Sequence, residues 1–369
     1  MGNDKEMPKV GSRVTHFGRN IDPSKLPEYG KNLLNPDPRL ISEKLLKRET
    51  FKPVSAANLL MAAWIQFMVH DWFFHENEDQ EYHVVPLKED DPFPEKPMKI
   101  EKSKPSPVQE IPGVVAFDND HTHWWDGTQI YGKNQERLNQ LRTFTDGKLK
   151  IQDDGVLEKD TNGIDLTGFN NNYWIGLSVL HTMFTLEHNY LCDQLKAQHP
   201  ELNDEELFQK ARLINSMMMA KIHTIEWTPA ILFNPTLDMA MNANWNGIDA
   251  NVDNLLDDYL DIKNPLVKGA IKTVLSGASG IMDKLDDLLG EDVDTIRELD
   301  YVLNGIIGND REYFGSYHAL TEEFVAVYRL HSLIPDELTF RKHENDEMIR
   351  EVGTFFTAQK MVSDIYEQN

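Results

Sequence analysis

The stretch that decides the fold is Leu59–Val69, LLMAAWIQFMV, which leads directly into His70 and Asp71. Gln66 is its only polar residue, and a helix that is apolar all round is typical of a protein interior. Gln66 and His70 are four residues apart, so a helix places them on one line of its surface. Because buried polar groups need partners, these side chains indicate a lined cavity with an ion beside Asp71. The alternative is a core histidine that bonds to a backbone carbonyl.

Two further helices are expected downstream of this one. Trp174–Lys196 carries apolar residues at helical spacing. Asn203 and Glu206 have the spacing of a capping box, in which each side chain accepts from the backbone N–H of the other residue. We expect the helix that they begin to run to about Trp227, where Pro229 ends it.

The remaining segments give the expected domain organisation. Residues 1–50 are polar and rich in Pro and Gly, which predicts an extended N-terminal arm with at most one short helix near Ile41–Lys47. Residues 51–369 then form one helical catalytic domain. Within it, Glu76–Pro112 is acidic and rich in proline, which predicts a long loop. Thr321, followed by two acidic residues, predicts the start of a last helix that ends at Pro335. The expected fold class is mainly α.

Composition and charge exclude several classes of function. The 369 residues hold 61 acidic and 37 basic side chains, a formal net charge of −24, and such a field repels nucleic acid. Cys192 is the single cysteine, so a reducing compartment is the simplest interpretation. The sequence has neither an apolar signal-peptide stretch nor a run of about 18 apolar residues. We therefore expect a cytoplasmic protein without a transmembrane helix, and leave open peripheral contact with a membrane or lipid surface.

A second polar cluster is the stretch from Thr122 to Thr128, THWWDGT, which leads to the sequence IYG. Thr122, Asp126 and Thr128 alternate with backbone carbonyls in a short loop, which suits a hard cation such as calcium, with its oxygen ligands. Asp71 would complete the set and tie the buried helix to this loop. Two alternatives stay open: a plain turn with a packed tryptophan pair, and a transition-metal site at the two histidines of HTHWW, which lacks a third nitrogen or sulfur ligand nearby.

A third cluster lies in Glu323–His331, EFVAVYRLH. Tyr328 and His331 are three residues apart and would share one face of a helix. A neutral imidazole is a strong iron ligand, and an axial histidine is a common way to hold haem. A tyrosine one turn from such a ligand is placed for oxidation to a radical. The alternative is a tyrosine and a histidine on the polar face of a helix.

Taken in order, five motifs resemble the haem peroxidase superfamily that includes myeloperoxidase and prostaglandin synthase. They are WIQFMVHDW, HTHWWDGTQIYG, LHTMFTLEHNYLCDQLK, AKIHTIEWT and EEFVAVYRLHSLIPD. The motifs look most like those of the fatty-acid α-dioxygenases known from plants, and FGRN at Phe17–Asn20 and NPDPR at Asn35–Arg39 fit the same branch. The resemblance extends from about Val10 to Glu337, which implies a haem peroxidase-type helical core with long loops and a structural calcium site.

The resemblance also implies a role for each motif residue. His70 corresponds to the distal histidine that takes and returns the peroxide proton, and Gln66 would hydrogen-bond the distal water or ligand. His331 corresponds to the proximal iron ligand, and Tyr328 to the radical tyrosine. His223, in AKIHTIEWT, matches the histidine that holds the substrate carboxylate. The implied calcium ligands are Asp71, Thr122, Trp124 through its carbonyl, Asp126 and Thr128.

These roles imply an oxidoreductase that uses haem b and calcium. Peroxide and the haem would convert Tyr328 to a radical, which abstracts a hydrogen from the carbon next to the carboxylate of a fatty acid. Dioxygen then adds to give a 2-hydroperoxy fatty acid, a reaction of oxylipin and lipid metabolism with a link to oxidative stress. One alternative is a haem peroxidase that uses hydrogen peroxide on small reductants. Another is a non-catalytic remnant or fragment that lacks haem.

Two departures from the family pattern affect these expectations. The chain ends soon after His331, whereas the family continues, so we expect the C-terminal part of the family domain to be missing. That part normally supplies an asparagine that orients the proximal histidine and an arginine for the substrate carboxylate. The distal arginine of the myeloperoxidase-like branch should fall near Asn170–Asn172, where three asparagines stand instead.

Overall fold

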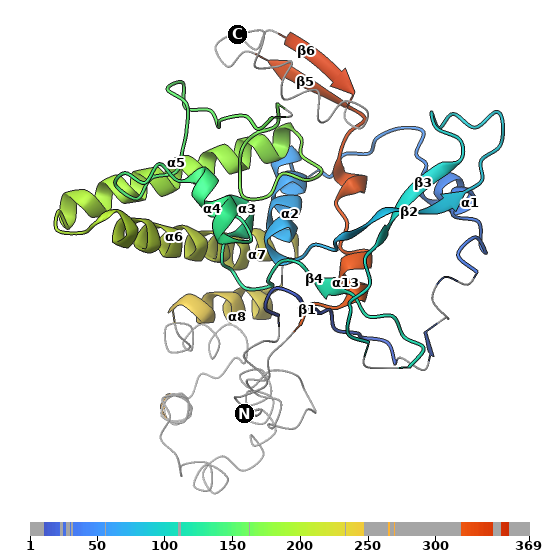
Figure 1. The fold of residues 1–369 in the computed structure, drawn as a ribbon, viewed down its shortest axis with the longest axis horizontal. Helices are drawn as coiled ribbons and strands as arrows, with labels where there is room; N and C mark the ends of the chain where they lie inside the picture. Colours follow the sequence, from blue (N-terminus) through green and yellow to red (C-terminus); the bar gives the residue numbers. More distant parts are fainter. Residues whose placement is uncertain are drawn as a thin grey trace, which may run out of the picture. The chain divides into compact units, whose positions relative to one another are not determined.

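The computed structural model (Figure 1) describes residues 11–22, 25–26, 30, 32–55, 57–109, 112–161, 163–232, 234–246, 265, 269, 319–341 and 348–353. The chain divides into two compact units. The larger unit comprises residues 8–216 and 317–369, and the smaller one comprises residues 1–7 and 217–316. The fold is mainly helical, as the sequence predicts.

The core of the larger unit is built on α2 (Leu59–Trp72) and α5 (Ile175–Gln198), which pack against each other. Both helices lie where the apolar patterns predict them. Phe67 of α2 is fully buried and stacks on Phe184 of α5, with ring centroids 5.3 Å apart. Aromatic burial of this kind supplies much of the energy of a helix interface. Two short helices complete the core, α3 (Thr128–Tyr131), which contacts both α2 and α5, and α4 (Gln135–Leu141), which contacts α3.

Among the described residues of the N-terminal arm, one short helical segment lies near the predicted position. This segment consists of α1 (Pro38–Ile41) and the π-helical turn η3 (Ser42–Leu46). Before it, β1 (Thr15–His16) pairs antiparallel with β4 (Asp118–Asn119). The arm is therefore held by backbone pairing to the segment that directly precedes the HTHWWDG motif.

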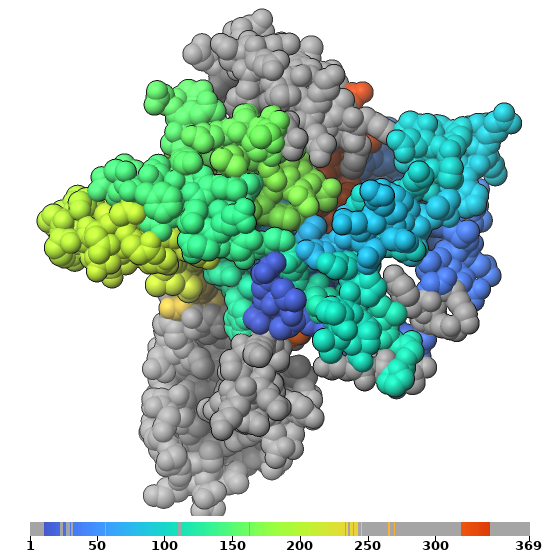
Figure 2. All heavy atoms as spheres, in the orientation of Figure 1, coloured from blue at the N-terminus to red at the C-terminus, as the bar shows by residue number. Residues whose placement is uncertain are grey.

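The long loop predicted over Glu76–Pro112 is wrong, because this segment contains a β-hairpin. β2 (Asn77–Val85) and β3 (Met98–Ser103) pair antiparallel. Figure 2 shows this hairpin, in light blue and cyan, at the surface of the larger unit. Val85 is the one buried residue in the two strands, so the apolar alternation that marks a half-buried strand is missing. The prolines that suggested a loop flank the two strands rather than interrupt them.

The last helix is also shorter than predicted. α13 (Glu322–Val327) begins as expected, with the Thr321 side chain accepting from the Phe324 N–H, but it ends eight residues before Pro335. Tyr328 leaves the helical conformation at φ −79° and ψ 87°. His331 instead begins a separate 3₁₀ turn, η8 (His331–Leu333). Valines are weak helix formers, and the Arg329 side chain donates to the Ala326 carbonyl and satisfies one of the last carbonyls of the helix. Tyr328 and His331 therefore do not share a helix face.

The capping box begins α6 (Asp204–Lys221) as predicted. The Glu206 N–H donates to Asn203 Oδ1, and the Asn203 N–H donates to Glu206 Oε2, both at 3.0 Å. The helical path then continues beyond Pro229, contrary to the prediction. It passes through the π-helical turn η4 (Ile222–Trp227) into α7 (Thr228–Ile231). Pro229 stands in the first turn of α7, a position where proline is tolerated.

Two more elements complete the described part of the chain. α8 (Pro235–Asn246) follows α7 in the smaller unit, and a hairpin of β5 (Glu337–Arg341) and β6 (Met348–Gly353) follows η8 in the larger one. Within the described residues, no helix is both long and apolar enough to cross a membrane.

Candidate active site

α2 places His70 in the interior of the larger unit. Its imidazole is buried. It packs on the Phe169 ring in an edge-to-face arrangement, with ring centroids 4.9 Å apart. Its Nδ1 has no hydrogen-bond partner among the described residues. Burial lowers the pKa of His70 to about 3, with nearby His121 adding to the effect. The ring is therefore neutral at pH 7.

Gln66 lies one helical turn before His70 and ties α2 to the start of α5. Its Nε2 donates to the Asn172 carbonyl at 3.0 Å, and its Oε1 accepts from the Trp174 indole N–H at 2.7 Å. The carboxamide has a second N–H, which these two bonds leave available. Its role toward a distal ligand stays a prediction.

Asp71 reaches from α2 to the HTHWWDG loop. Its Oδ1 accepts from the Thr128 N–H at 2.6 Å. In the loop, the hydroxyls of Thr122 and Thr128 donate to the two carboxylate oxygens of Asp126, at 3.1 and 2.9 Å. The Thr122 hydroxyl also lies 3.4 Å from the Trp124 carbonyl. The structure therefore gathers all five implied calcium ligands in one place, with residues from two separate segments.

The electrostatics of this cluster fit a cation. The pKa of Asp71 is raised well above its usual value, because the carboxyl is buried and because the Asp126 carboxylate lies beside it. Two facing carboxylates, two hydroxyls and a carbonyl form an all-oxygen set, which suits calcium rather than zinc. In the described part of the chain, no group of three or more His, Cys, Asp or Glu side chains gathers as a metal site. A cavity of about 230 Å³ reaches Thr122, Asp126 and Thr128.

The two histidines of HTHWW differ in their surroundings. His121 is buried among Phe74 and Phe169, and neither ring nitrogen has a hydrogen-bond partner among the described residues. His123 instead donates its backbone N–H to the Gly11 carbonyl and packs its ring on the half-exposed Trp124. Nothing in this arrangement favours a transition-metal pair.

The segment with Tyr328 and His331 lies beside α2. The turn η8 contacts α2, and Phe324 of α13 packs against Phe73 at the end of α2, with ring centroids 6.2 Å apart. His75 and Glu322 add a hydrogen bond of 2.9 Å between the same two segments. The structure thus brings the predicted proximal segment to the helix of the predicted distal histidine.

Both predicted residues of this segment are uncharged at neutral pH. Tyr328 stacks on Phe324 at 4.8 Å between centroids, and burial raises its pKa to about 12. Burial and the nearby Arg329 lower the pKa of His331. A protonated phenol and a neutral imidazole are the forms that hydrogen-atom transfer and iron ligation require.

His223 belongs to the smaller compact unit. It lies in the π-helical turn η4, where its ring stacks on Trp227 with centroids 4.8 Å apart. Burial lowers its pKa to about 4. Its carbonyl accepts from the Thr228 hydroxyl at 2.7 Å. Turns of π-helix are frequent at functional sites.

Two residues that organise the site were missed in the sequence. Asn119 is buried and donates to the Trp72 carbonyl at 2.8 Å, while its oxygen accepts from the N–H groups of Phe74 and His121. Arg212 of α6 donates to the Asp126 carbonyl at 3.1 Å. Apart from His121, their partners lie far away in the chain, so local spacing does not mark either residue as part of the site.

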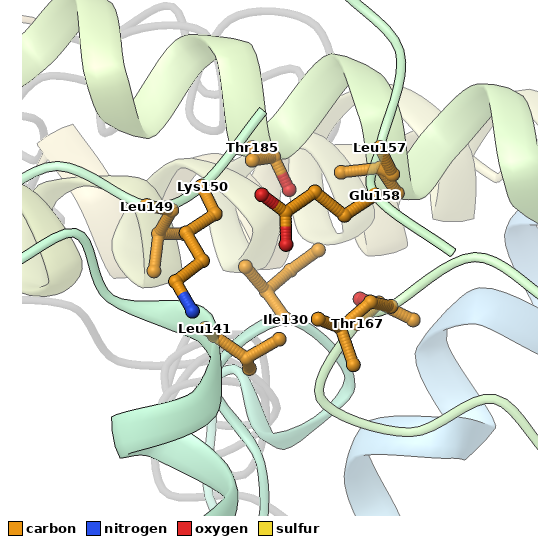
Figure 3. Close-up of a pocket in the computed structure, with 9 residues that line it drawn as sticks. Ile130, Leu141, Leu149, Lys150, Leu157, Glu158, Thr167 and Thr185 are labelled. Atoms are coloured by element: carbon orange, nitrogen blue, oxygen red, sulfur yellow. The ribbon is translucent and has the colours of Figure 1, made fainter. Parts of the chain in front are cut away.

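A second cavity lies beside α5 and away from these residues. Lys150, Glu158 and Thr185 are among its lining side chains (Figure 3). Its volume is about 10 Å³, which is room for no more than one water molecule. None of the predicted site residues lines it.

The chain matches known proteins along most of its length. The model of the family described as "Animal haem peroxidase" matches residues 1–279. This chain therefore belongs to the animal haem peroxidase family. Within the family it is similar to the alpha-dioxygenase PIOX of Oryza sativa subsp. japonica, with 37% identity over 342 residues, which are 92% of this chain and 49% of the relative.

Solved structures agree with this assignment. One similar structure is the crystal structure of the Oryza sativa fatty acid alpha-dioxygenase, in a Tyr-to-Phe variant with palmitic acid. The comparison gives a TM-score of 0.71 at 32% sequence identity and covers 97% of this chain and 54% of that one. The fatty acid alpha-dioxygenase of Arabidopsis thaliana gives a TM-score of 0.71 at 32% identity, with 97% of this chain and 52% of that one covered. The chain thus spans about half the length of the relatives it matches.

Proposed function

We propose that this chain forms the haem-binding core of a fatty-acid α-dioxygenase, which converts a fatty acid and dioxygen to a 2-hydroperoxy fatty acid. One observation carries the proposal: η8, with His331, packs against α2, with His70, although the two segments lie far apart in the sequence. This contact brings the implied iron-binding histidine and the implied proton-transferring histidine onto neighbouring elements. Similarity to relatives named alpha-dioxygenases supports the substrate class.

The side chains present fit a haem. His331 would bind the haem iron, and His70 would act as the proton-transferring histidine, with Gln66 one helical turn before it. His70 is buried and neutral, with an Nδ1 that no described residue engages. When bound, haem supplies the one-electron oxidation that peroxide initiates. His70 would hold the proton that the peroxide gives up and return it.

Tyr328 would carry out the hydrogen transfer. After it loses the hydrogen atom of its hydroxyl, its oxygen takes a hydrogen from the carbon next to the substrate carboxylate. Dioxygen adds to that carbon, and the hydrogen returns from Tyr328 to complete the hydroperoxide. His223 would bind the carboxylate. Since its ring is neutral at pH 7, it would act as a hydrogen-bond donor rather than as a cation.

We also propose that Asp71, Asp126 and their oxygen neighbours bind calcium. The cation would neutralise two adjacent carboxylates and hold α2 to the HTHWWDG loop. Because Asp71 follows His70 directly, this link would fix the position of the distal histidine.

The test uses the full 369-residue chain produced with added haem precursor. We expect a Soret band that the His331→Ala variant loses, and oxygen uptake on palmitate that Tyr328→Phe abolishes. Tyr190→Phe, at a half-exposed tyrosine of α5, is the matched control and should keep full activity. The product should be the 2-hydroperoxide by mass spectrometry.

Two results would contradict the proposal. Oxidation of a phenol by hydrogen peroxide that is unchanged in Tyr328→Phe, without palmitate turnover, would identify a peroxidase for small reductants. A folded chain without a Soret band would identify a core that does not hold haem.

A further inference from the structure

Tyr131 and His188 form a buried pair that the proposed reaction does not use. Tyr131 ends α3, His188 lies on α5, and both side chains have 0% exposure. Tyr131 Oη and His188 Nδ1 are 2.9 Å apart. The Phe208 ring packs against both rings, with centroids 5.9 Å from Tyr131 and 5.3 Å from His188. A phenol and a base therefore share a hydrogen bond inside an aromatic environment.

The neighbouring hydrogen bonds fix the tautomer of His188. Its Nε2 lies 2.9 Å from the Gly147 carbonyl, and since a carbonyl only accepts, Nε2 carries the proton. Burial lowers the pKa of His188 to about 4, so the ring is neutral at pH 7. Nδ1 therefore presents a lone pair and accepts the hydroxyl proton of Tyr131.

Asn215 fixes the other side of the tyrosine oxygen. Its Nδ2 donates to the Phe184 carbonyl at 3.0 Å, which requires the amide nitrogen on that side. The same Nδ2 donates to Tyr131 Oη at 2.9 Å. The tyrosine oxygen thus accepts from Asn215 and donates to His188. Its proton has one route out, through the hydrogen bond to Nδ1.

The pair lies near the candidate site and beside a fixed positive charge. Tyr131 is three residues beyond Thr128, whose N–H donates to Asp71, and its helix α3 contacts α2, which carries His70. The Arg212 guanidinium carbon lies 5.0 Å from the centre of the Tyr131 ring. This charge opposes loss of an electron from the ring, so the pair requires a strong oxidant.

We propose that Tyr131 and His188 are a redox-active pair. Tyr131 gives one electron to a strong one-electron oxidant, the peroxide-activated haem of the proposed function, while its hydroxyl proton moves to His188 Nδ1. The products are a neutral tyrosyl radical and an imidazolium held by the Gly147 carbonyl, and a returning electron reverses both transfers. The oxidant rests on the proposed function, but the chemistry of the pair does not. Tyr131 would thus be a second residue, besides Tyr328, that can carry the radical.

The first experiment needs no haem. The full chain is oxidised by a photogenerated ruthenium(III) polypyridyl complex, frozen, and studied by electron paramagnetic resonance and electron–nuclear double resonance in H₂O and D₂O. We expect a tyrosyl radical component with two coupled exchangeable protons, one from His188 Nδ1 and one from Asn215 Nδ2. This component should form more slowly in D₂O. Tyr131→Phe should lose this component. The double-resonance spectrum of the unaltered chain tests the hydrogen bond even where that variant is unstable.

Tyr173→Phe is the matched control. Tyr173 is also fully buried, and its hydroxyl donates to Asp165 at 3.0 Å. That carboxylate already accepts from the Lys159 ammonium and the Ser178 hydroxyl, which makes it a weaker proton acceptor. The hydrogen-bonded component should persist in this variant. A component that survives in Tyr131→Phe, or disappears only in Tyr173→Phe, overturns the proposal.

The second experiment adds hydrogen peroxide to the haem-loaded chain and looks for the same component. Its appearance supports peroxide-activated haem as the oxidant. Its absence in a chain with a Soret band overturns that part of the proposal. A chain without a Soret band contradicts the proposed function, while the photochemical result still decides the pair.

Discussion

Asp71 and Asp126 show how two residues from separate segments make one site. Burial raises the pKa of the Asp71 carboxyl, and the neighbouring Asp126 carboxylate raises it further because it opposes ionisation. Without a cation, this arrangement is unfavourable at neutral pH, since like charges in a poorly solvated site repel. A divalent cation would reverse the sign of the interaction.

Asp71→Asn is therefore expected to preserve or raise thermal stability without calcium, and to remove the stabilisation that calcium gives. The amide keeps an oxygen for the Thr128 N–H but removes the charge, so the melting temperature in EGTA should rise or stay constant. Calcium at a hundred times its dissociation constant should stabilise the unaltered chain by about 2.7 kcal/mol, and this gain should be lost in the variant. Differential scanning calorimetry with EGTA or calcium measures both effects. An equal response of the two proteins to calcium would show that Asp71 is not a ligand.

At the scale of elements, α6 depends on the reciprocal cap at its start. Asn203 and Glu206 satisfy two backbone N–H groups that the helix itself leaves unpaired. The same helix carries Arg212 to the Asp126 carbonyl and Asn215 to Tyr131. Its first turn thus supports contacts made two and three turns later.

Asn203→Ala should lower the free energy of unfolding by about 1 kcal/mol, the usual contribution of such a cap. Asn203→Asp keeps the accepting oxygen and serves as the control, with stability close to that of the unaltered chain. Urea unfolding followed by circular dichroism measures the difference. Equal losses in both variants would mean that the cap does not stabilise α6.

At the scale of the molecule, several histidines are buried in their neutral form. Burial lowers the pKa of His188 to about 4 and that of His181 well below its usual value. In the unfolded chain both would titrate near pH 6.5. Between these values the unfolded chain binds more protons than the folded one, so stability falls as the pH drops through this window.

We therefore expect the free energy of unfolding to decrease from pH 7 to pH 5, before most carboxylates titrate. Between pH 6.5 and pH 4, His188 alone lowers the free energy of unfolding by at most about 3 kcal/mol. Urea unfolding at intervals between pH 7 and pH 5 measures the slope. His188→Phe should reduce the slope, whereas His199→Gln, at an exposed position, should leave it unchanged. A stability that is constant over this range would contradict the expectation.

Strong local signals in the sequence determined much of the framework. An apolar run without charges predicted α2, apolar residues at helical spacing predicted α5, and a capping box predicted the start of α6. Each of these signals lies within a few turns of one helix. The order of the motifs indicated the family, which the comparisons confirm. The polar residues of the HTHWWDG loop were also recognisable by their close spacing, and the structure brings them together with Asp71. Calcium binding there stays a prediction.

Only the tertiary structure decided the rest. The β2–β3 hairpin is held by pairing between exposed strands, whose side chains carry no apolar alternation. The helix break at Tyr328 leaves His331 to begin the turn that contacts α2. Tyr131, His188 and Asn215 come from three different helices. Hydrogen bonds between distant segments depend on how the helices pack. Residues that meet in this way have no regular spacing in the sequence, so no sequence pattern predicts them.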